Sequence, residues 1–380
     1  MQPQDYFKST AGKPVLTKKG YWSFIPNPLP PTLNWSLDLV SRLAEAEREL
    51  AKLSAILSNF PFPQLLLQTF IRNEAVLSSR IEGTHASLND VFRFEAKQLS
   101  FFETTDDVKE VLNYAKALEY GMERLKTLPI SLRLTRELHR KLTHAVRGGM
   151  LTPGEFRASQ NWIGPAGSTL ETALFVPPPV EEMHQSLGEL EKFIHANSEL
   201  PAIIRVALIH YQFEAIHPFL DGNGRVGRLL MLLLFCEWKL LPLPILNLSI
   251  YIERYRQIYY DLLLKVSKSG EWEAWIKFFL TGVSEQSQHT VISLHQLQLL
   301  RNQYQSIIDM DRNPTRMGAV IDYLFTRPIF SIRQISDELK IPFKTASSYL
   351  SKLEQKAVIE EITGQSRNRI YRANAILSNL

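Results

Sequence analysis

The feature that most constrains the fold is a polar loop enclosed between two strongly apolar segments. The loop is residues 217–228, His-Pro-Phe-Leu-Asp-Gly-Asn-Gly-Arg-Val-Gly-Arg. Residues 203–213 before it are apolar over most of a helix surface, and residues 229–236 after it form an unbroken apolar run. Helices that are apolar on all sides belong in a core. The sequence therefore predicts a reactive loop held rigidly between two buried helices.

The residue types in this loop favour an anion. Gly222 and Gly224 permit positive φ, which lets successive N–H groups converge on an anion. The loop leads into a helix predicted over 225–238, whose N-terminal dipole also favours phosphate. Arg225 and Arg228 lie at i and i+3, so both guanidinium groups share one face of the first turn. The pattern indicates a polyphosphate site.

Two further residues of the loop supply chemistry. Asp221 directly precedes the turn and is placed to hold the hard cation that accompanies a nucleotide. His217 precedes Pro218, which predicts the end of the upstream helix there and leaves an imidazole as a general base. A metal hydrolase using His210, Glu214 and Asp221 is the weaker interpretation. It lacks the i, i+4 histidine pair of zincins and leaves the two arginines unexplained.

The loop resembles the Fic motif, His-Pro-Phe-x-Asp/Glu-Gly-Asn-Gly-Arg-x-x-Arg, with every defined position filled. The resemblance implies a protein adenylyltransferase that moves AMP from ATP to a Ser, Thr or Tyr hydroxyl of another protein, or of itself. It assigns His217 as the base and Asp221 as the Mg²⁺ ligand. The nucleotide-binding residues that it implies are Gly222, Asn223 and Gly224 around the α-phosphate, Arg225 at the β-phosphate and Arg228 at the γ-phosphate.

A second fragment, Ser78-Ser79-Arg80-Ile81-Glu82-Gly83, ends a helix predicted over 64–80. It resembles the inhibitory motif of Fic proteins, Ser/Thr-x-x-x-Glu-Gly/Asn, in the subclass whose inhibitory helix precedes the core. The resemblance implies that Glu82 and Ser78 form the inhibitory element, with Glu82 paired to Arg228 in place of the γ-phosphate. ATP bound out of line then reacts slowly, since such misplacement costs a factor of about a hundred or more.

Between the two motifs the sequence predicts a β-hairpin. Residues 161–163 and 174–176 bracket a tip rich in Gly, Pro and Ser at 164–169. The turn before it, 151–157, also resembles the Fic core, in which such a flap lies beside the active site. An open hairpin edge can pair with an extended target segment; the alternative is a hairpin that only covers the core. The expected docking residues are Ile163, Gly164, Leu174 and Phe175.

Apolar periodicity predicts a mainly α-helical protein in three parts. Residues 1–104 comprise a proline-rich extended arm over 1–35 and two helices, the second carrying the inhibitory motif. Residues 105–312 comprise the Fic-type helical core with its hairpin flap and the helices that follow it. Residues 313–380 form a separate unit. Helices are expected over 37–57, 64–80, 108–125, 132–146, 180–196, 248–267 and 272–297.

The C-terminal unit resembles a winged helix domain, with two short helices joined by a turn at 340–342 and a hairpin around 364–366. It holds ten Lys/Arg and six Asp/Glu, while residues 1–312 hold 33 of each sign, so the net charge of +4 comes from this unit. DNA is one expected partner. Protein docking or a homodimer is the other, and the sequence leaves both open. The candidate phosphate contacts are Lys344, Lys352, Arg367 and Arg369.

The cysteine content, the N-terminal sequence and the length of the apolar runs indicate the cellular compartment. Cys236 is the single cysteine and lies in the apolar run, so a disulfide framework is excluded and a reducing compartment is expected. The N-terminus lacks a signal-peptide pattern, and the run at 229–236 is far shorter than the roughly 20 residues of a membrane span. A soluble, cytoplasmic protein without a membrane partner is expected.

Three alternatives to AMP transfer remain open for the same site. It could use another nucleotide, or it could remove AMP from a modified protein with Glu82 positioning water; exchange of nucleotides in an assay separates these. The third is a DNA-binding regulator whose Fic core only senses nucleotide. Salt-sensitive binding to a defined DNA site without a labelled protein product would favour that reading.

Overall fold

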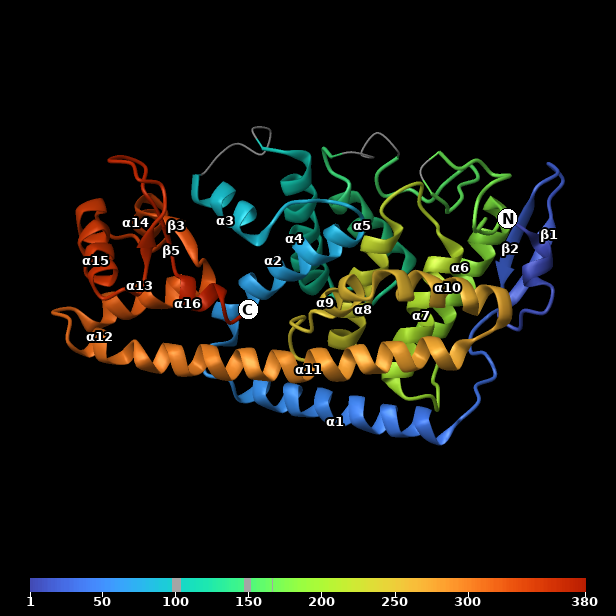
Figure 1. Ribbon diagram of the computed structural model, residues 1–380, viewed down its shortest axis with the longest axis horizontal. Helices are drawn as coiled ribbons and strands as arrows, with labels where there is room; N and C mark the ends of the chain where they lie inside the picture. Colours follow the sequence, from blue (N-terminus) through green and yellow to red (C-terminus); the bar gives the residue numbers. More distant parts are fainter. Residues whose placement is uncertain (98–103, 147–151, 166) are drawn as a thin grey trace.

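The computed structural model describes residues 1–97, 104–146, 152–165 and 167–380. The molecule is elongated and mainly helical (Figure 1). Its longest helix, α11 (Trp272–Gln303), runs along most of the long axis with α1 (Leu37–Asn59) beside it. The N-terminal strands lie at one end and the C-terminal unit at the other. The predicted mainly α class is confirmed.

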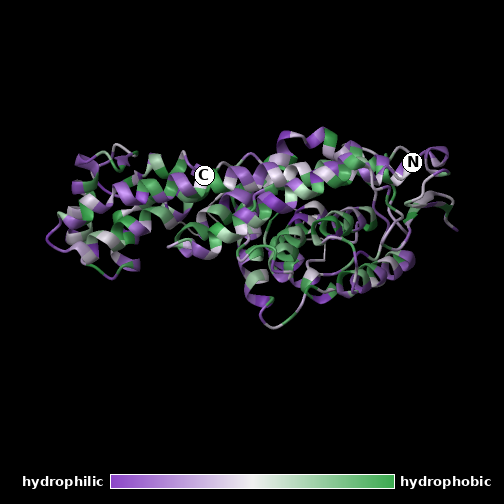
Figure 2. Cartoon of the chain, turned by 90° about the horizontal axis from the view of Figure 1, so that it is seen from below, coloured by the Kyte–Doolittle hydropathy of each residue, from purple (hydrophilic) through white to green (hydrophobic). Residues whose placement is uncertain are grey.

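The motif loop lies in the middle of the molecule, between two buried helices. These are α7 (Ala202–Ile216) and α8 (Asn223–Glu237), and nearly every residue of both is buried. Figure 2 shows apolar residues gathered on the interior helices and polar residues on the outer turns. The helices around the pair are α2 (Pro63–Ile81), α4 (Asp106–Arg124), α5 (Leu132–Leu142), α6 (Val180–His195), α9 (Leu248–Arg254) and α10 (Arg256–Ser269).

Side-chain caps set several of the helix starts. Ser36, Thr105 and Ser131 each accept a backbone N–H three residues ahead, at the starts of α1, α4 and α5. Some helices differ in extent from the sequence prediction. The helix expected over 248–267 is broken at Tyr255 (φ −112°, ψ 34°) into α9 and α10, and the helix expected to reach 146 ends at Leu142.

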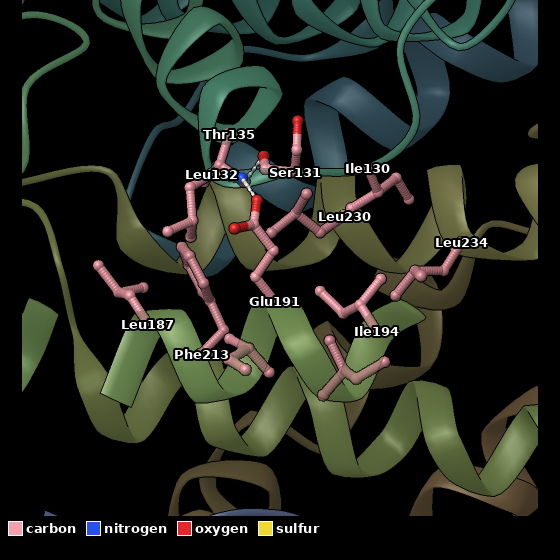
Figure 3. A pocket seen from close by; sticks show the side chains of 12 residues that line it. Ile130, Ser131, Leu132, Thr135, Leu187, Glu191, Ile194, Phe213, Leu230 and Leu234 are labelled. Carbon is pink, nitrogen blue, oxygen red and sulfur yellow. Dashed lines mark hydrogen bonds between the residues drawn. The ribbon is translucent and has the colours of Figure 1, made fainter. Parts of the chain in front are cut away.

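Helix α5 is anchored at its N-terminus by α6. The Glu191 carboxylate accepts the N–H of Leu132 at 2.7 Å, which satisfies one of the N–H groups that a helix start leaves unpaired (Figure 3). Leu187, Phe213 and Leu230 belong to an apolar layer that joins α5 and α6 to the α7–α8 pair. This packing fixes the direction in which the second half of α5 meets the motif loop.

The N-terminal region is more ordered than an extended arm. Residues 3–6 form a short 3₁₀ helix, η1 (Pro3–Tyr6), and β1 (Gly12–Leu16) pairs antiparallel with β2 (Trp22–Pro26). The predicted extended arm did not include this strand pairing; most of the prolines lie at or after the end of β2 and limit the strand without excluding it. Phe24 of β2 is fully buried, and its N–H donates to Val176 O at 2.8 Å.

The C-terminal unit combines helices with a three-stranded antiparallel sheet of order β3-β5-β4. Two short helices and a two-stranded wing are present, as expected; their assignment to the winged helix family stays a prediction. Lys352, one of the candidate phosphate contacts, lies 2.5 Å from Asp311 in an ion pair. The elements are α12 (Gln305–Asp309), α13 (Pro314–Thr326), β3 (Ile329–Ser331), α14 (Ile332–Glu338), α15 (Phe343–Gln355), β4 (Glu360–Glu361), β5 (Ile370–Arg372) and α16 (Asn374–Leu377).

This unit packs directly on the region that precedes the core. Thr69 of α2 donates its hydroxyl to Phe325 O of α13 at 2.8 Å. Helix α3 (Leu88–Lys97), which the sequence analysis did not predict, lies against β3, and Phe92 is buried there with Ile329 and Ile370. Among the residues described, no helix combines the length and the apolarity that crossing a bilayer requires.

Candidate functional site

His217 ends α7 in the left-handed region, at φ 50° and ψ 61°. Its Nδ1 lies 3.3 Å from the carbonyl oxygen of Glu214, and since a carbonyl only accepts, Nδ1 carries the ring proton. Nε2 is then left with a lone pair, which a general base requires. Burial lowers the pKa of His217 to about 4, so the ring is neutral at physiological pH.

Two residues that the sequence analysis did not name hold the backbone of this histidine. Arg157 Nε donates to His217 O at 3.0 Å and Asn161 Nδ2 donates to the same oxygen at 3.1 Å. Asn161 also donates to Phe219 O at 2.8 Å. Arg157 ends the turn at 151–157, of which Leu151 lies outside the described residues. An arginine in a Fic-like turn was the only sequence signal for this role.

Asn223 is turned inward. Its Oδ1 accepts the N–H of Phe219 and its Nδ2 donates to Phe219 O, both at 2.8 Å, and only 2% of the residue is exposed. The Asn223 side chain therefore holds one part of the loop to another by hydrogen bonds and is not directed at a ligand. A contact between Asn223 and a phosphate, as the motif implies, is left to its backbone N–H.

The start of α8 offers that backbone. Gly222 takes φ 79°, and the helical hydrogen bonds begin with Val226 N–H to Gly222 O at 3.0 Å. The N–H groups of residues 223–225 thus have no acceptor within the helix, and the helix dipole points the same way. The helix begins two residues earlier than the predicted 225. This is the geometry of an anion site.

Asp221 and Arg225 lie at the mouth of the loop. Arg225 is 5% exposed, and its Nη1 donates to Glu110 of α4 at 2.8 Å, a buried pair that the sequence analysis did not predict. Asp221 accepts the N–H of Gly222 at 2.7 Å, lies 3.7 Å from Arg225 and is 44% exposed. One carboxylate thus faces solvent beside the helix start.

The Asp221 carboxylate fits Mg²⁺ only if the ion binds together with a phosphate group. In the part of the chain that the structure describes, no group of three or more His, Cys, Asp or Glu could enclose a metal. Mg²⁺ normally keeps several waters and is held by one or two carboxylates together with substrate phosphates. Asp221 beside an anion site satisfies that requirement.

Arg228 is the most enclosed charge in the site, with 1% of its side chain exposed. Its Nε donates to Ser78 Oγ at 2.8 Å, and its Nη2 donates to Ser78 O at 2.9 Å and to Glu82 Oε1 at 2.6 Å. Burial alone would lower the pKa of Arg228, but its interactions with Glu82, and to a lesser extent with Tyr259 and Tyr114, together outweigh burial and raise it. The same pairing lowers the pKa of Glu82 against the opposite effect of burial.

The Glu82 carboxylate also lies against the first turn of α8. A Cβ placed on Gly224 would come within 2.3 Å of Glu82 Oε1. An acidic side chain thus occupies the space in front of the helix start and the guanidinium of Arg228 together. The structure brings Ser78, Glu82, Gly224 and Arg228 into one cluster, although about 150 residues separate the first two from the last two.

The flap is smaller than the predicted hairpin. It is a single antiparallel bridge in which Ile163 N–H donates to Phe175 O at 2.8 Å and Phe175 N–H to Ile163 O at 3.1 Å. Ile163 and Leu174 are exposed by 38% and 54%. Phe175 differs from the predicted exposed docking position: its ring is buried against Tyr6 and Phe24, so its side chain anchors the flap.

The last predicted docking residue, Gly164, begins the tip of the flap. A Cβ there would lie 2.6 Å from Ser168 Oγ, so the tip closes tightly on itself. Residue 166 of the tip lies outside the described residues. Exposed side chains therefore remain at two of the four predicted docking positions.

Comparison with known families matches this arrangement. Residues 40–123 match the Fic/DOC family N-terminal region, and residues 129–235 match the Fic/DOC family itself. This chain belongs to the Fic/DOC family. The family match contains the motif loop, α5 and the flap, while the N-terminal match contains Ser78 and Glu82.

Relatives of this Fic protein include proteins named "Protein adenylyltransferase Fic" from Drosophila grimshawi and Drosophila virilis. They are 28% and 29% identical over 179 residues, which is 46% of this chain and 33% of each relative. The aligned part is thus about a third of their length. A Fic family protein from Desulfovibrio desulfuricans G20 has the same fold, with a TM-score of 0.59 and 18% identity over 91% of this chain and 98% of that one.

Proposed function

We propose that this Fic protein transfers AMP from ATP to a hydroxyl side chain of a protein, and that Glu82 restrains the reaction. The observation that carries the proposal is the Glu82 carboxylate in front of the α8 N-terminus, paired with buried Arg228. The site accepts an anion, and a residue of the chain itself occupies it. The adenylyltransferase names of the Drosophila relatives support AMP as the transferred group.

His217 would act on the incoming hydroxyl. Its Nε2 lone pair takes the hydroxyl proton while the hydroxyl oxygen forms a bond to the α-phosphorus of ATP. The bond from that phosphorus to the bridging oxygen breaks, and pyrophosphate leaves. The neutral ring is present at physiological pH because burial holds the pKa of His217 near 4. The carbonyl contacts from Arg157 and Asn161 keep the ring in place.

The phosphates would be held by groups that already favour anions. The free N–H groups of residues 223–225 face the α-phosphate and stabilise the charge that develops there. Asp221 would hold the Mg²⁺ that accompanies ATP, and the ion would supply positive charge that neutralises phosphate oxygens. Arg225 and Arg228 hold the β- and γ-phosphates, and Arg228 must exchange Glu82 for that purpose. The γ-phosphate and the Glu82 carboxylate compete for the Arg228 guanidinium, so ATP that binds while Glu82 is in place is misaligned.

The target would lie along the flap. Ile163 and Leu174 present apolar side chains to solvent on the segment that leads toward the motif loop through Asn161. An extended peptide with a Ser, Thr or Tyr could pack there with little demand on its flanking sequence.

The test uses the full chain with Glu82→Gly, ATP labelled at the α-phosphate, Mg²⁺ and a cell lysate. We expect label on protein, dependent on Mg²⁺, absent with γ-labelled ATP and lost in the Glu82→Gly/His217→Ala control. Replacing ATP by GTP, CTP or UTP identifies the nucleotide. Absence of labelled protein together with absence of Mg-nucleotide binding would overturn the proposal, and loss of label from a pre-modified protein would instead indicate AMP removal.

A further inference from the structure

His139 is a buried histidine outside the motif that contacts the motif loop at several points. It lies in the second half of α5 and is 2% exposed. The N–H of Gly154 donates to its Nδ1 at 2.8 Å, and since a backbone N–H only donates, Nδ1 is unprotonated and the ring proton is on Nε2. Nε2–H therefore donates to Asp221 O, which lies 3.1 Å away.

The ring also packs under the loop. It stacks on Phe219 with ring centroids 3.8 Å apart and an interplanar angle of 3°. A Cβ added to Gly222 would lie 3.6 Å from the His139 ring, so the tight turn rests on it. One side chain thus touches Phe219, Asp221 and Gly222, on both sides of the proposed cation ligand.

The contact with Asp221 O has a geometric consequence. A trans peptide is planar, and its C=O and N–H point in opposite directions. Holding the carbonyl of Asp221 on the α5 side therefore turns the N–H of Gly222 to the other side. That N–H is the 2.7 Å donor to Asp221 Oδ1. His139 sets the plane of this peptide, and the peptide sets the direction of the carboxylate.

We propose that His139 is a positioning residue that orients the Asp221 carboxylate for the cation that enters with the nucleotide. This inference rests on the proposed function. The carboxylate is 44% exposed, and within the part of the chain that the structure describes its partners are Gly222 N–H and Arg225 at 3.7 Å, so few described contacts fix it. Outer contacts of this kind typically change metal affinity by about 10–100-fold when removed.

The test compares two substitutions that divide the functions of the ring. His139→Asn can place an acceptor where Nδ1 accepts from Gly154 but cannot reach Asp221, whereas His139→Gln can place a donor where Nε2 donates to Asp221 O. Both lose the stacking on Phe219. Binding of ATP is measured by calorimetry with Mg²⁺ and with chelator, in the Glu82→Gly background, for the parent, His139→Asn, His139→Gln and His139→Phe.

We expect His139→Asn and His139→Phe to weaken Mg-ATP binding about tenfold or more, to change chelator-ATP binding much less, and His139→Gln to recover most of the difference. Equal Mg-ATP affinity in parent and His139→Asn overturns the inference. So does equal weakening with and without Mg²⁺, which indicates a packing role only. If His139→Phe does not fold, the Asn and Gln pair decides. A parent that binds no Mg-ATP refutes the proposed function itself.

Discussion

Two substitutions of Glu82 distinguish the effect of its negative charge from the effect of its side-chain volume. Glu82→Gly removes both the charge paired with Arg228 at 2.6 Å and the side chain in front of Gly224. Glu82→Gln removes the charge and keeps the volume. We expect AMP transfer to rise in both, more in the Gly variant, because the γ-phosphate then gains Arg228 and the α-phosphate comes into line.

The magnitudes follow from burial. Leaving a fully buried charge unpaired costs about 3–5 kcal/mol of unfolding free energy. Glu82 is 31% exposed and Arg228 keeps two bonds to Ser78, so we expect a smaller loss, about 1–3 kcal/mol. Correct alignment of ATP should raise the transfer rate about a hundredfold. The variant is thus less stable without ligand but more active.

Initial rates of transfer from α-labelled ATP and thermal unfolding with and without Mg-ATP measure the two effects. Mg-ATP should raise the melting temperature of Glu82→Gly more than that of the wild type, because tighter binding stabilises the folded state more at equal concentration. Equal transfer rates and equal ATP affinities in wild type and Glu82→Gly would remove Glu82 from the control of this site.

The other predictions use Glu82→Gly as the parent. His217→Ala lowers transfer by about 10²–10⁴-fold and leaves Mg-ATP binding by calorimetry unchanged; retained transfer would refute the base role. As the pH is lowered, kcat/KM should fall only near pH 4, because burial lowers the pKa of His217 to about 4 and the neutral ring is lost only below that pH. A pH profile in which kcat/KM already falls near pH 6.5 would contradict this. Leu174→Asp should lower target modification about tenfold with Mg-ATP binding intact, and equal labelling would show that the flap does not dock the target.

The sequence allowed the site to be predicted where chemistry is local. Residues 217–228 are contiguous, so their types and spacing indicated the loop, the helix start and the two arginines. The pairing of Glu82 with Arg228 followed from a recognisable fragment at a helix end. The long helices followed from apolar periodicity, since α1 and α11 bury one face along their length.

What could not be predicted depends on packing between distant segments. Glu110 reaches Arg225, and His139 reaches Asp221, only because α4 and α5 pack against α8. Asn223 turns inward because Phe219 leaves a donor and an acceptor that its amide fits. The inward direction of Phe175 was within reach of the sequence, because successive strand residues face opposite sides and Leu174 faces outward.

Helix α2 contacts both the C-terminal unit and Arg228 of the motif loop. In its second turn Thr69 donates to α13 of the C-terminal unit, and in its last turn Ser78 accepts from Arg228, nine residues and about 14 Å further on. If Glu82 restrains the reaction as proposed, a ligand that moves the C-terminal unit against α2 would therefore also shift the Glu82 carboxylate relative to Arg228. Linkage is reciprocal, so nucleotide in the active centre would alter the affinity of that distant ligand by the same factor.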